Sequence, residues 1–155
     1  MTDRGTEPRP SRILVAVDGS EYAKKAVNLG LALCKVLTAE LIVFHAIPVP
    51  RYSFTQADSG ASFPLAQYFA SARQEAQGLV DAVVTLAKGR GIGATGLVAE
   101  PTYSVVEAII HAAVVHNVDL IIVGSRGLSG FKKLLLGSVS AGVVNHAHCS
   151  VLVAR

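Results

Sequence analysis

The sequence predicts an α/β protein with an open parallel sheet covered by helices on both faces. Short apolar runs that suit strands alternate along the chain with stretches in which apolar residues recur every three or four positions, as in helices. The strand runs are continuously apolar, as expected of strands that are buried on both faces. Hydrophobic residues make up 51% of the chain and charged residues only 16%, which suits a sheet enclosed between two layers of helices.

Two strands and two helices are predicted in the first half of the chain. Residues 12–17 (RILVAV) form a buried strand, and apolar residues at helical spacing follow over 23–37. Residues 40–46 (ELIVFHA) form the second strand, after which Ser, Gly and Pro residues over 51–64 predict a flexible loop. A long amphipathic helix is predicted over 65–86, and the glycines that follow end it.

The second half continues the alternation. A weaker strand at 94–99 precedes a helix over 105–117, and a short apolar strand follows at 120–123. A helix is predicted to begin near Ser138, and residues 150–154 form the closing strand. Strands that are joined through helices predict right-handed crossovers and therefore a parallel sheet.

Length and composition narrow the classes of function. At 155 residues the chain fits one domain, and we expect a disordered polar leader over 1–10 and a single domain over 11–155. No apolar run reaches the roughly 18 residues of a membrane span, and the leader lacks the apolar segment of a signal peptide. The net charge of +3 is too small and scattered to indicate nucleic-acid binding. We therefore expect a cytoplasmic protein that binds neither membranes nor nucleic acid.

Cysteine and histidine residues give little sign of a metal or redox site. Cys34 and Cys149 lie in apolar contexts without metal-ligand spacing, which favours reduced structural thiols. His146 and His148 lie with Cys149 where a helix is predicted to end, and donors this few and this close in sequence do not make a four-ligand site. We predict no bound structural metal.

A glycine-rich segment after the strand at 120–123 has the features of a phosphate site. It contains Gly124, Gly127 and Gly137, followed directly by Ser138, a spacing of G-x2-G-x9-G-[ST]. Glycines allow backbone N–H groups to approach an anion, and a helix that starts at Ser138 adds unpaired N–H groups. The motifs GxxxxGK[ST] and GxGxxG are absent, so neither a P-loop nor a dinucleotide site is indicated.

The same residues have structural explanations. Asp18 with Glu21 three positions later forms a D-x-x-E helix-capping pattern, and Ser138 is also a favoured N-cap residue. Arg126 and Lys132 would either pair with phosphates or be solvated, and Gly130 would shape the loop.

A GxxG loop at 127–130 suggests an RNA-binding KH domain, but a KH loop joins two helices and this one follows a strand.

The motif and several neighbouring segments resemble the universal stress protein family, in its UspA-like, ATP-binding subgroup. These segments are VAVDGS at 15–20, IIVGSRG, LLLGSVS and the terminal CSVLVAR. The resemblance covers nearly the whole chain from Ser11 to Arg155. It implies the adenine-nucleotide alpha-hydrolase-like fold with strand order 3-2-1-4-5, in which Asp18 and the Gly124 loop meet at one crevice, where ligands bind in such sheets.

The resemblance also implies an ATP site, with Mg²⁺ held through the phosphates. The implied nucleotide-binding residues are Ala16, Val17, Asp18, Ala46, Val123, Gly124, Arg126, Gly127, Gly137, Ser138, Val139 and Ser140. Ser125 is excluded from this set. Ala46 stands where the family often has a larger aliphatic residue, and Ser150 stands where it usually has proline.

No catalytic residue is assigned. Asp119 lies at the far end of its strand from the glycine loop, which leaves Asp18 and Glu100 as the acidic groups expected near the crevice, without a positioned base. We expect at most slow ATP hydrolysis.

The implied function is a nucleotide-dependent regulatory module of the stress response. The alternatives are a slow ATP hydrolase or a family variant that binds cyclic AMP. The family order places residues 150–154 at the sheet edge, and this apolar strand contains no proline or lysine to protect it. A homodimer through this strand is therefore expected.

Overall fold

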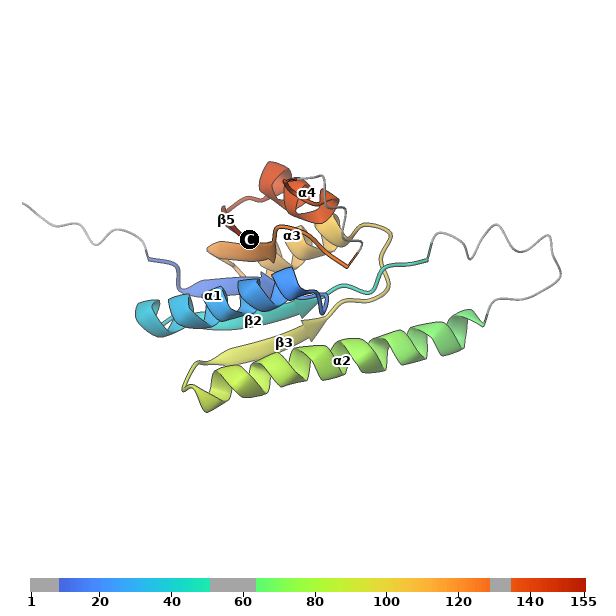
Figure 1. Ribbon diagram of the computed structural model, residues 1–155, viewed down its shortest axis with the longest axis horizontal. Coiled ribbons are helices and arrows are strands. Elements are labelled where there is room, and N and C mark those ends of the chain that lie inside the picture. Colours follow the sequence, from blue (N-terminus) through green and yellow to red (C-terminus); the bar gives the residue numbers. More distant parts are fainter. Residues whose placement is uncertain (1–8, 51–63, 129–134) are drawn as a thin grey trace, which may run out of the picture.

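The fold is an open parallel sheet with helices on both faces (Figure 1). The computed structural model describes residues 9–50, 64–128 and 135–155. All strand pairs are parallel, and the strand order is β3-β2-β1-β4-β5. The predicted fold class and strand order are confirmed. The predictions for residues 1–8 of the leader, for 51–63 of the loop, and for Gly130 and Lys132 lie outside the described residues.

Strands and helices alternate from the first described element to the last. In chain order they are β1 (Arg12–Ala16), α1 (Glu21–Leu37), β2 (Glu40–His45), α2 (Leu65–Gly89), β3 (Ala94–Val98), α3 (Val105–Val115), β4 (Leu120–Gly124), α4 (Ser138–His146) and β5 (Ser150–Ala154). Each lies where the sequence pattern predicts it, with ends that agree or differ by up to three residues.

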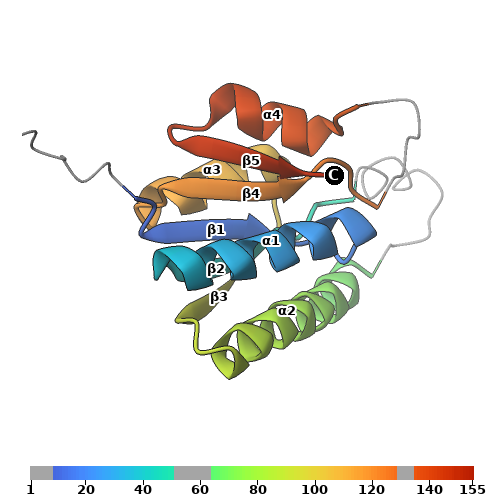
Figure 2. The same cartoon turned by 60° about the vertical axis from the view of Figure 1, so that its left-hand side comes forward.

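Helices α1 and α2 cover one face of the sheet, and α3 and α4 cover the other (Figure 2). Successive side chains of a strand point to opposite faces. Ile13 and Val15 of β1 accordingly pack in the core beneath α1 and α2, whereas Leu14 packs with Ile109 of α3 and Val143 of α4. This two-sided burial explains why the strands are continuously apolar.

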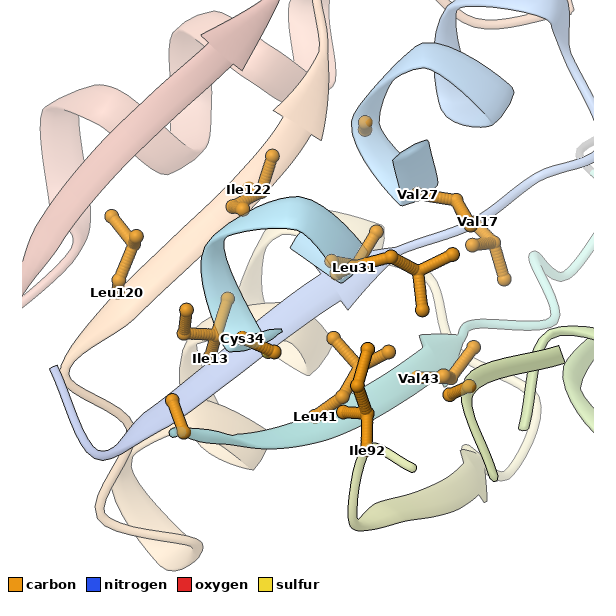
Figure 3. Close-up of a cluster of buried hydrophobic side chains, with 14 of the residues drawn as sticks. Ile13, Val17, Val27, Leu31, Cys34, Leu41, Val43, Ile92, Leu120 and Ile122 are labelled. Carbon is orange, nitrogen blue, oxygen red and sulfur yellow. The ribbon is translucent and has the colours of Figure 1, made fainter. Parts of the chain in front are cut away.

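Figure 3 shows the core on the α1 side, where Leu31 and Cys34 of α1 lie over strand residues that include Ile13 and Leu41. Cys34 is only 1% exposed, which confirms that it is a packing residue. Burial raises the pKa of its thiol to about 11, so the thiol stays protonated and unreactive at neutral pH.

Asp119 precedes β4 and lies at the end of the sheet opposite the glycine loop, as expected. Its Oδ2 accepts hydrogen bonds from the backbone N–H of Ser11 at 2.7 Å, the Ser11 hydroxyl at 2.8 Å and the backbone N–H of Arg12 at 2.9 Å. Asp119 therefore joins the start of β1 to the start of β4. No helix within the described ranges is long and apolar enough to cross a membrane.

Candidate functional site

A cavity of about 280 Å³ opens at the carboxyl ends of β1, β2 and β4. Every residue of the nucleotide-binding set that the resemblance implies lines this cavity, including Ala16, Asp18, Ala46 and Val139. Ser125, which was excluded, does not line it. The sequence interpretation missed further lining residues: Ala23, Phe44, His45, Pro48, Val105, Ile109 and Leu128. The strand order could have indicated Phe44 and His45, because β2 ends beside β1 in that order.

The turn between β1 and α1 is shaped by Asp18, but Asp18 does not cap the helix. Ser20 is the N-cap, and its side chain accepts a hydrogen bond from Ala23 N–H at 3.1 Å. Asp18 Oδ1 instead accepts from Ser20 N–H at 2.9 Å, across Gly19 with φ +82°. The capping hypothesis for Asp18 is therefore wrong, because two more residues, Gly19 and Ser20, precede the first helical residue.

The other carboxylate oxygen of Asp18 faces the glycine loop. A Cβ placed on Gly127 would lie 2.9 Å from Asp18 Oδ2, so the glycine allows the loop to approach the carboxylate closely. Asp18 and the loop thus meet at one crevice, as the strand order requires.

The segment after β4 is fixed by Ser125. Its backbone N–H donates to Ala154 C=O at 2.7 Å, and its C=O accepts from Gly137 N–H at 2.7 Å and from the Ser140 hydroxyl at 3.0 Å. Ser125 and Ser140 are both 2% exposed. These bonds hold the start of α4 against the end of β4, and they occupy the backbone N–H of Gly137.

The first turn of α4 has backbone N–H groups for which the described residues offer no acceptor. Gly137, and not Ser138, is the N-cap, and it has no side-chain capping bond. The first bond of the helix runs from Ala141 N–H to Gly137 C=O at 3.0 Å. The N–H groups of Ser138, Val139 and Ser140 therefore have no acceptor within the helix. Together with the helix dipole they favour an anion at this end of the cavity.

Positive side chains lie beside the same end. Arg126 lines the cavity, and its Nη1 donates to the Tyr22 hydroxyl at 3.3 Å, with the guanidinium carbon 5.5 Å from the ring centre. Lys25 Nζ lies 5.2 Å from the centre of the same ring. Cations over an aromatic face are held by the ring's negative potential. Arg126 thus adds positive charge to the glycine-loop side of the cavity, and Lys25 lies near the same tyrosine ring outside the cavity lining.

At the other end of the cavity the hydrogen-bond ladder between β1 and β2 stops early. Val17 N–H still donates to Phe44 C=O at 2.8 Å. In a continued parallel ladder, Val17 C=O would accept from Ala46 N–H. The imidazole of His45 takes that place, with Nδ1 2.7 Å from Val17 O. Because a carbonyl oxygen only accepts, we assign the proton to Nδ1.

This side-chain hydrogen bond in place of a backbone one explains two differences from the predicted strands. The apolar patterns extend through Val17 and Ala46, but β1 ends at Ala16 and β2 at His45, because a side chain replaces the next ladder bond.

Ala46 is left with its backbone N–H and C=O facing the cavity side. The carbonyls of His45 and Ile47 point towards β3 and its extension, where they accept from Ala99 N–H at 2.9 Å and Thr102 N–H at 2.8 Å. Because backbone groups alternate sides along a strand, those of Ala46 point towards β1. In the part of the chain that the structure describes, they make no hydrogen bond. Ala46 lines the cavity and is 7% exposed.

Acidic groups are scarce at the cavity. Glu100, expected near the crevice, does not line it, because its carboxylate pairs with Arg73 of α2 at 3.0 and 2.5 Å. Asp18 is the acidic residue among those that line the cavity. Within residues 9–50, 64–128 and 135–155 no group of three or more His, Cys, Asp or Glu side chains could hold a metal ion.

Comparisons with known proteins identify the family. The model of the universal stress protein family matches residues 10–155. A universal stress protein of Thermus aquaticus is 36% identical over 149 residues, which cover 92% of this chain and 97% of that protein. A universal stress protein of Synechocystis sp. is 31% identical over 153 residues, which cover 93% of this chain and 97% of that protein.

Solved structures show the same fold. The universal stress protein UspA from Lactobacillus plantarum superposes with a TM-score of 0.79 at 22% identity, covering 96% of this chain and 100% of that one. A universal stress protein in complex with cAMP has a TM-score of 0.65 at 24% identity, covering 96% and 99%. A family protein from Arabidopsis thaliana with AMP bound has a TM-score of 0.65 at 18% identity, covering 94% and 91%. The family match over nearly the whole chain, the relatives and the fold agree: this chain belongs to the universal stress protein family.

Proposed function

We propose that this protein binds ATP in the cavity and acts in the cytoplasm as a nucleotide-dependent regulatory module of the stress response. One observation carries the proposal: a single cavity has backbone groups of Ala46 on one side and N–H groups of α4 on the other, and neither set has a hydrogen-bond partner among the described residues. A ligand with a polar base edge and an anionic tail satisfies both sets. The relatives with bound AMP and cAMP support an adenine nucleotide.

The base fits the Ala46 side by hydrogen-bond pattern. Ala46 offers one N–H donor and one C=O acceptor. Adenine presents the complement on its Watson–Crick edge, with N1 as acceptor and the 6-amino group as donor. Guanine presents the reverse, with O6 as acceptor and N1–H as donor, so it would place like groups together. A site built to pair with specific polar groups discriminates strongly against analogues that leave those groups unpaired. Val17 and Val123 supply apolar wall for the ring.

The triphosphate fits the α4 side. The N–H groups of Ser138, Val139 and Ser140 would donate to phosphate oxygens, with Gly127 allowing close approach of the loop and Arg126 adding positive charge. Gly137 would contribute wall and not its N–H, because that donor is bonded to Ser125. Mg²⁺ would be held mainly through the phosphates, as is usual for nucleotide sites.

Hydrolysis is expected to be slow, below roughly 1 s⁻¹, which is the low end of ordinary enzymes. Asp18 already accepts from Ser20 N–H and lies against the glycine loop, and no other acidic side chain lines the described cavity. The cAMP-bound relative makes a cyclic-AMP-binding function the second candidate. Mass spectrometry of the nucleotide released from purified protein distinguishes ATP binding from cyclic AMP binding.

The sharpest test of the phosphate site removes one backbone donor. Ser138→Pro deletes the N–H at the first helical position, where proline is well tolerated. Gly137 before it has φ −70° and ψ 165°, the conformation that a residue preceding proline prefers. A hydrogen bond to a charged group contributes about 1.5–3 kcal/mol, so we expect ATP affinity to fall about tenfold or more.

Ser138→Ala is the matched control, since it removes the hydroxyl and keeps the N–H. It should bind ATP like the wild type, and both variants should keep the wild-type melting temperature. Calorimetric titration measures the affinities. A Ser138→Pro variant that binds ATP as tightly as Ser138→Ala would place the phosphates elsewhere.

A further inference from the structure

We propose that His45 is a positioning residue for base recognition, because its imidazole occupies the Val17 carbonyl and so keeps the Ala46 amide open to the ligand. His45 Nδ1 lies 2.7 Å from Val17 O, a short hydrogen bond. His45 is the last residue of β2 and is itself half-buried in the cavity wall. The inference rests on the proposed ATP site and adds the feature that selects its base.

The geometry leaves Ala46 N–H two possible partners. One is Val17 C=O, its partner in a continued parallel ladder. In the observed ladder Ala16 lies opposite Phe44, and the last hydrogen bond runs from Val17 N–H to Phe44 C=O. The other is a ligand in the cavity. Because the His45 imidazole already gives the Val17 carbonyl a donor, a second bond from Ala46 N–H would gain less than a first one.

Loss of the imidazole reverses this balance. The Val17 carbonyl would then be a buried acceptor without a donor, since Val17 is only 5% exposed. An unpaired buried carbonyl is unfavourable, and the nearest backbone donor in ladder register is Ala46 N–H. We therefore expect β1 and β2 to pair one step further, which removes the donor that reads adenine N1 and turns it away from the base.

The consequence is a loss of selectivity and not only of affinity. With the Ala46 donor withdrawn, adenine loses a hydrogen bond at N1. Guanine binding improves, because its N1–H no longer faces the Ala46 N–H. The ratio of ATP to GTP affinity should therefore fall. A general loosening of the cavity would weaken both nucleotides together and leave the ratio unchanged.

His45→Asn and His45→Leu are a matched pair for the test. The two side chains have nearly the same shape, but Asn carries an amide nitrogen as many bonds from Cα as His Nδ1, and Leu carries no donor. Dissociation constants for ATP and GTP are measured by calorimetry on the full chain. Since one neutral hydrogen bond contributes about 0.5–1.5 kcal/mol, we expect the ATP-to-GTP preference to fall up to about tenfold in the Leu variant and to be retained in the Asn variant.

Amide hydrogen exchange of Ala46 in the nucleotide-free protein gives an independent readout. We expect rapid exchange in the wild type and the Asn variant, and exchange slowed at least about tenfold in the Leu variant, because its N–H becomes bonded to Val17 O. Thermal melting shows that each variant is folded.

Two results would overturn the inference: a Leu variant with wild-type nucleotide preference and wild-type Ala46 exchange, or an Asn variant that behaves like the Leu variant in both. If the wild type binds neither nucleotide, the proposed function fails instead, and the exchange measurement still decides whether His45 keeps the Ala46 amide open.

Discussion

The three glycines of the G-x2-G-x9-G motif are predicted to respond differently to alanine, although the sequence motif treats them alike. None of the three is among the described residues with a positive φ, so only the space around the added Cβ matters. At Gly124 a Cβ would lie 2.7 Å from the backbone carbon of Tyr22, 2.8 Å from its Cβ and 2.9 Å from its backbone oxygen. The first turn of α1 is rigid backbone and must shift.

The other two sites are more tolerant, each in its own way. At Gly127 the nearest atom is Asp18 Oδ2 at 2.9 Å, the end of a side chain that can rotate away. At Gly137 the nearest atom is Arg126 Cα at 3.4 Å, an ordinary contact distance. Gly124 thus serves close packing of β4 against α1, and Gly127 serves the position of the carboxylate.

Magnitudes follow from these contacts. Overpacking against backbone costs about 1–3 kcal/mol, and 1 kcal/mol lowers the melting temperature of a chain of this size by about 2–4 °C. Gly124→Ala should therefore melt roughly 2–12 °C below the wild type. Gly127→Ala should lower the melting temperature less than Gly124→Ala, and it should bind ATP more weakly, because Asp18 is displaced. Gly137→Ala should lose about 1 kcal/mol or less, the typical cost at an N-cap.

Differential scanning calorimetry and ATP titration of the three variants test this order. The reasoning is wrong if Gly124→Ala melts with the wild type, or if Gly137→Ala is the least stable of the three.

Three further predictions concern other parts of the molecule. Burial raises the pKa of Asp119, but hydrogen bonds from Arg12 N–H and from Ser11 outweigh it and hold the pKa below its ordinary 3.8. The stability that Asp119 adds is therefore present above that value and lost at lower pH. The difference in melting temperature between wild type and Asp119→Asn should be full at neutral pH and vanish in strong acid, and a constant difference would contradict this. Iodoacetamide should modify half-buried Cys149 well before Cys34, whose pKa burial raises to about 11, and equal rates by mass spectrometry would contradict it. Ala154 C=O faces β4, where it accepts from Ser125 N–H, so Val151 and Val153 present their backbone to the open edge while Leu152 faces the β4 ladder. If the protein dimerises through β5, Val151→Pro should sediment as a folded monomer and Leu152→Pro should destabilise the fold; a wild-type monomer at micromolar concentration would exclude this interface.

Hydrophobic periodicity was sufficient for the elements, and resemblance supplied their order. Continuous apolar strands reflect burial beneath two helical layers, so each strand and helix could be found from its pattern. The ends of β1 and β2 could not, because Val17 and Ala46 are as apolar as their neighbours. What ends the ladder is the His45 imidazole, and no pattern of hydrophobicity shows that a side chain competes with a backbone donor.

The two helix caps were each misplaced by one or two positions for a related reason. Asp18 and Ser20 are both favoured caps within one short turn, as are Gly137 and Ser138 across the next helix start. Only the geometry of the turn decides which of them reaches the helix N–H groups. Asp18 is released from capping by Ser20, and this release lets its second oxygen face the glycine loop.

The position of the cavity follows from the way the chain leaves β1. The central strand has β2 on one side and β4 on the other, and it turns away at Gly19, where φ is +82°. Beyond this turn the ladder with β1 stops, and the backbone groups past its end must be satisfied in another way. After β4, Ser125 N–H still pairs with Ala154 C=O of β5, and the Ser125 carbonyl accepts from Gly137 and Ser140, which anchors α4 against the end of β4. Beside β2, the Val17 carbonyl is satisfied by the His45 side chain, and the backbone of Ala46 is left open towards the cavity. Among the described residues, the backbone groups that hold β1, β2, β4 and α4 together are thus hydrogen-bonded, and those that we propose a nucleotide uses are not.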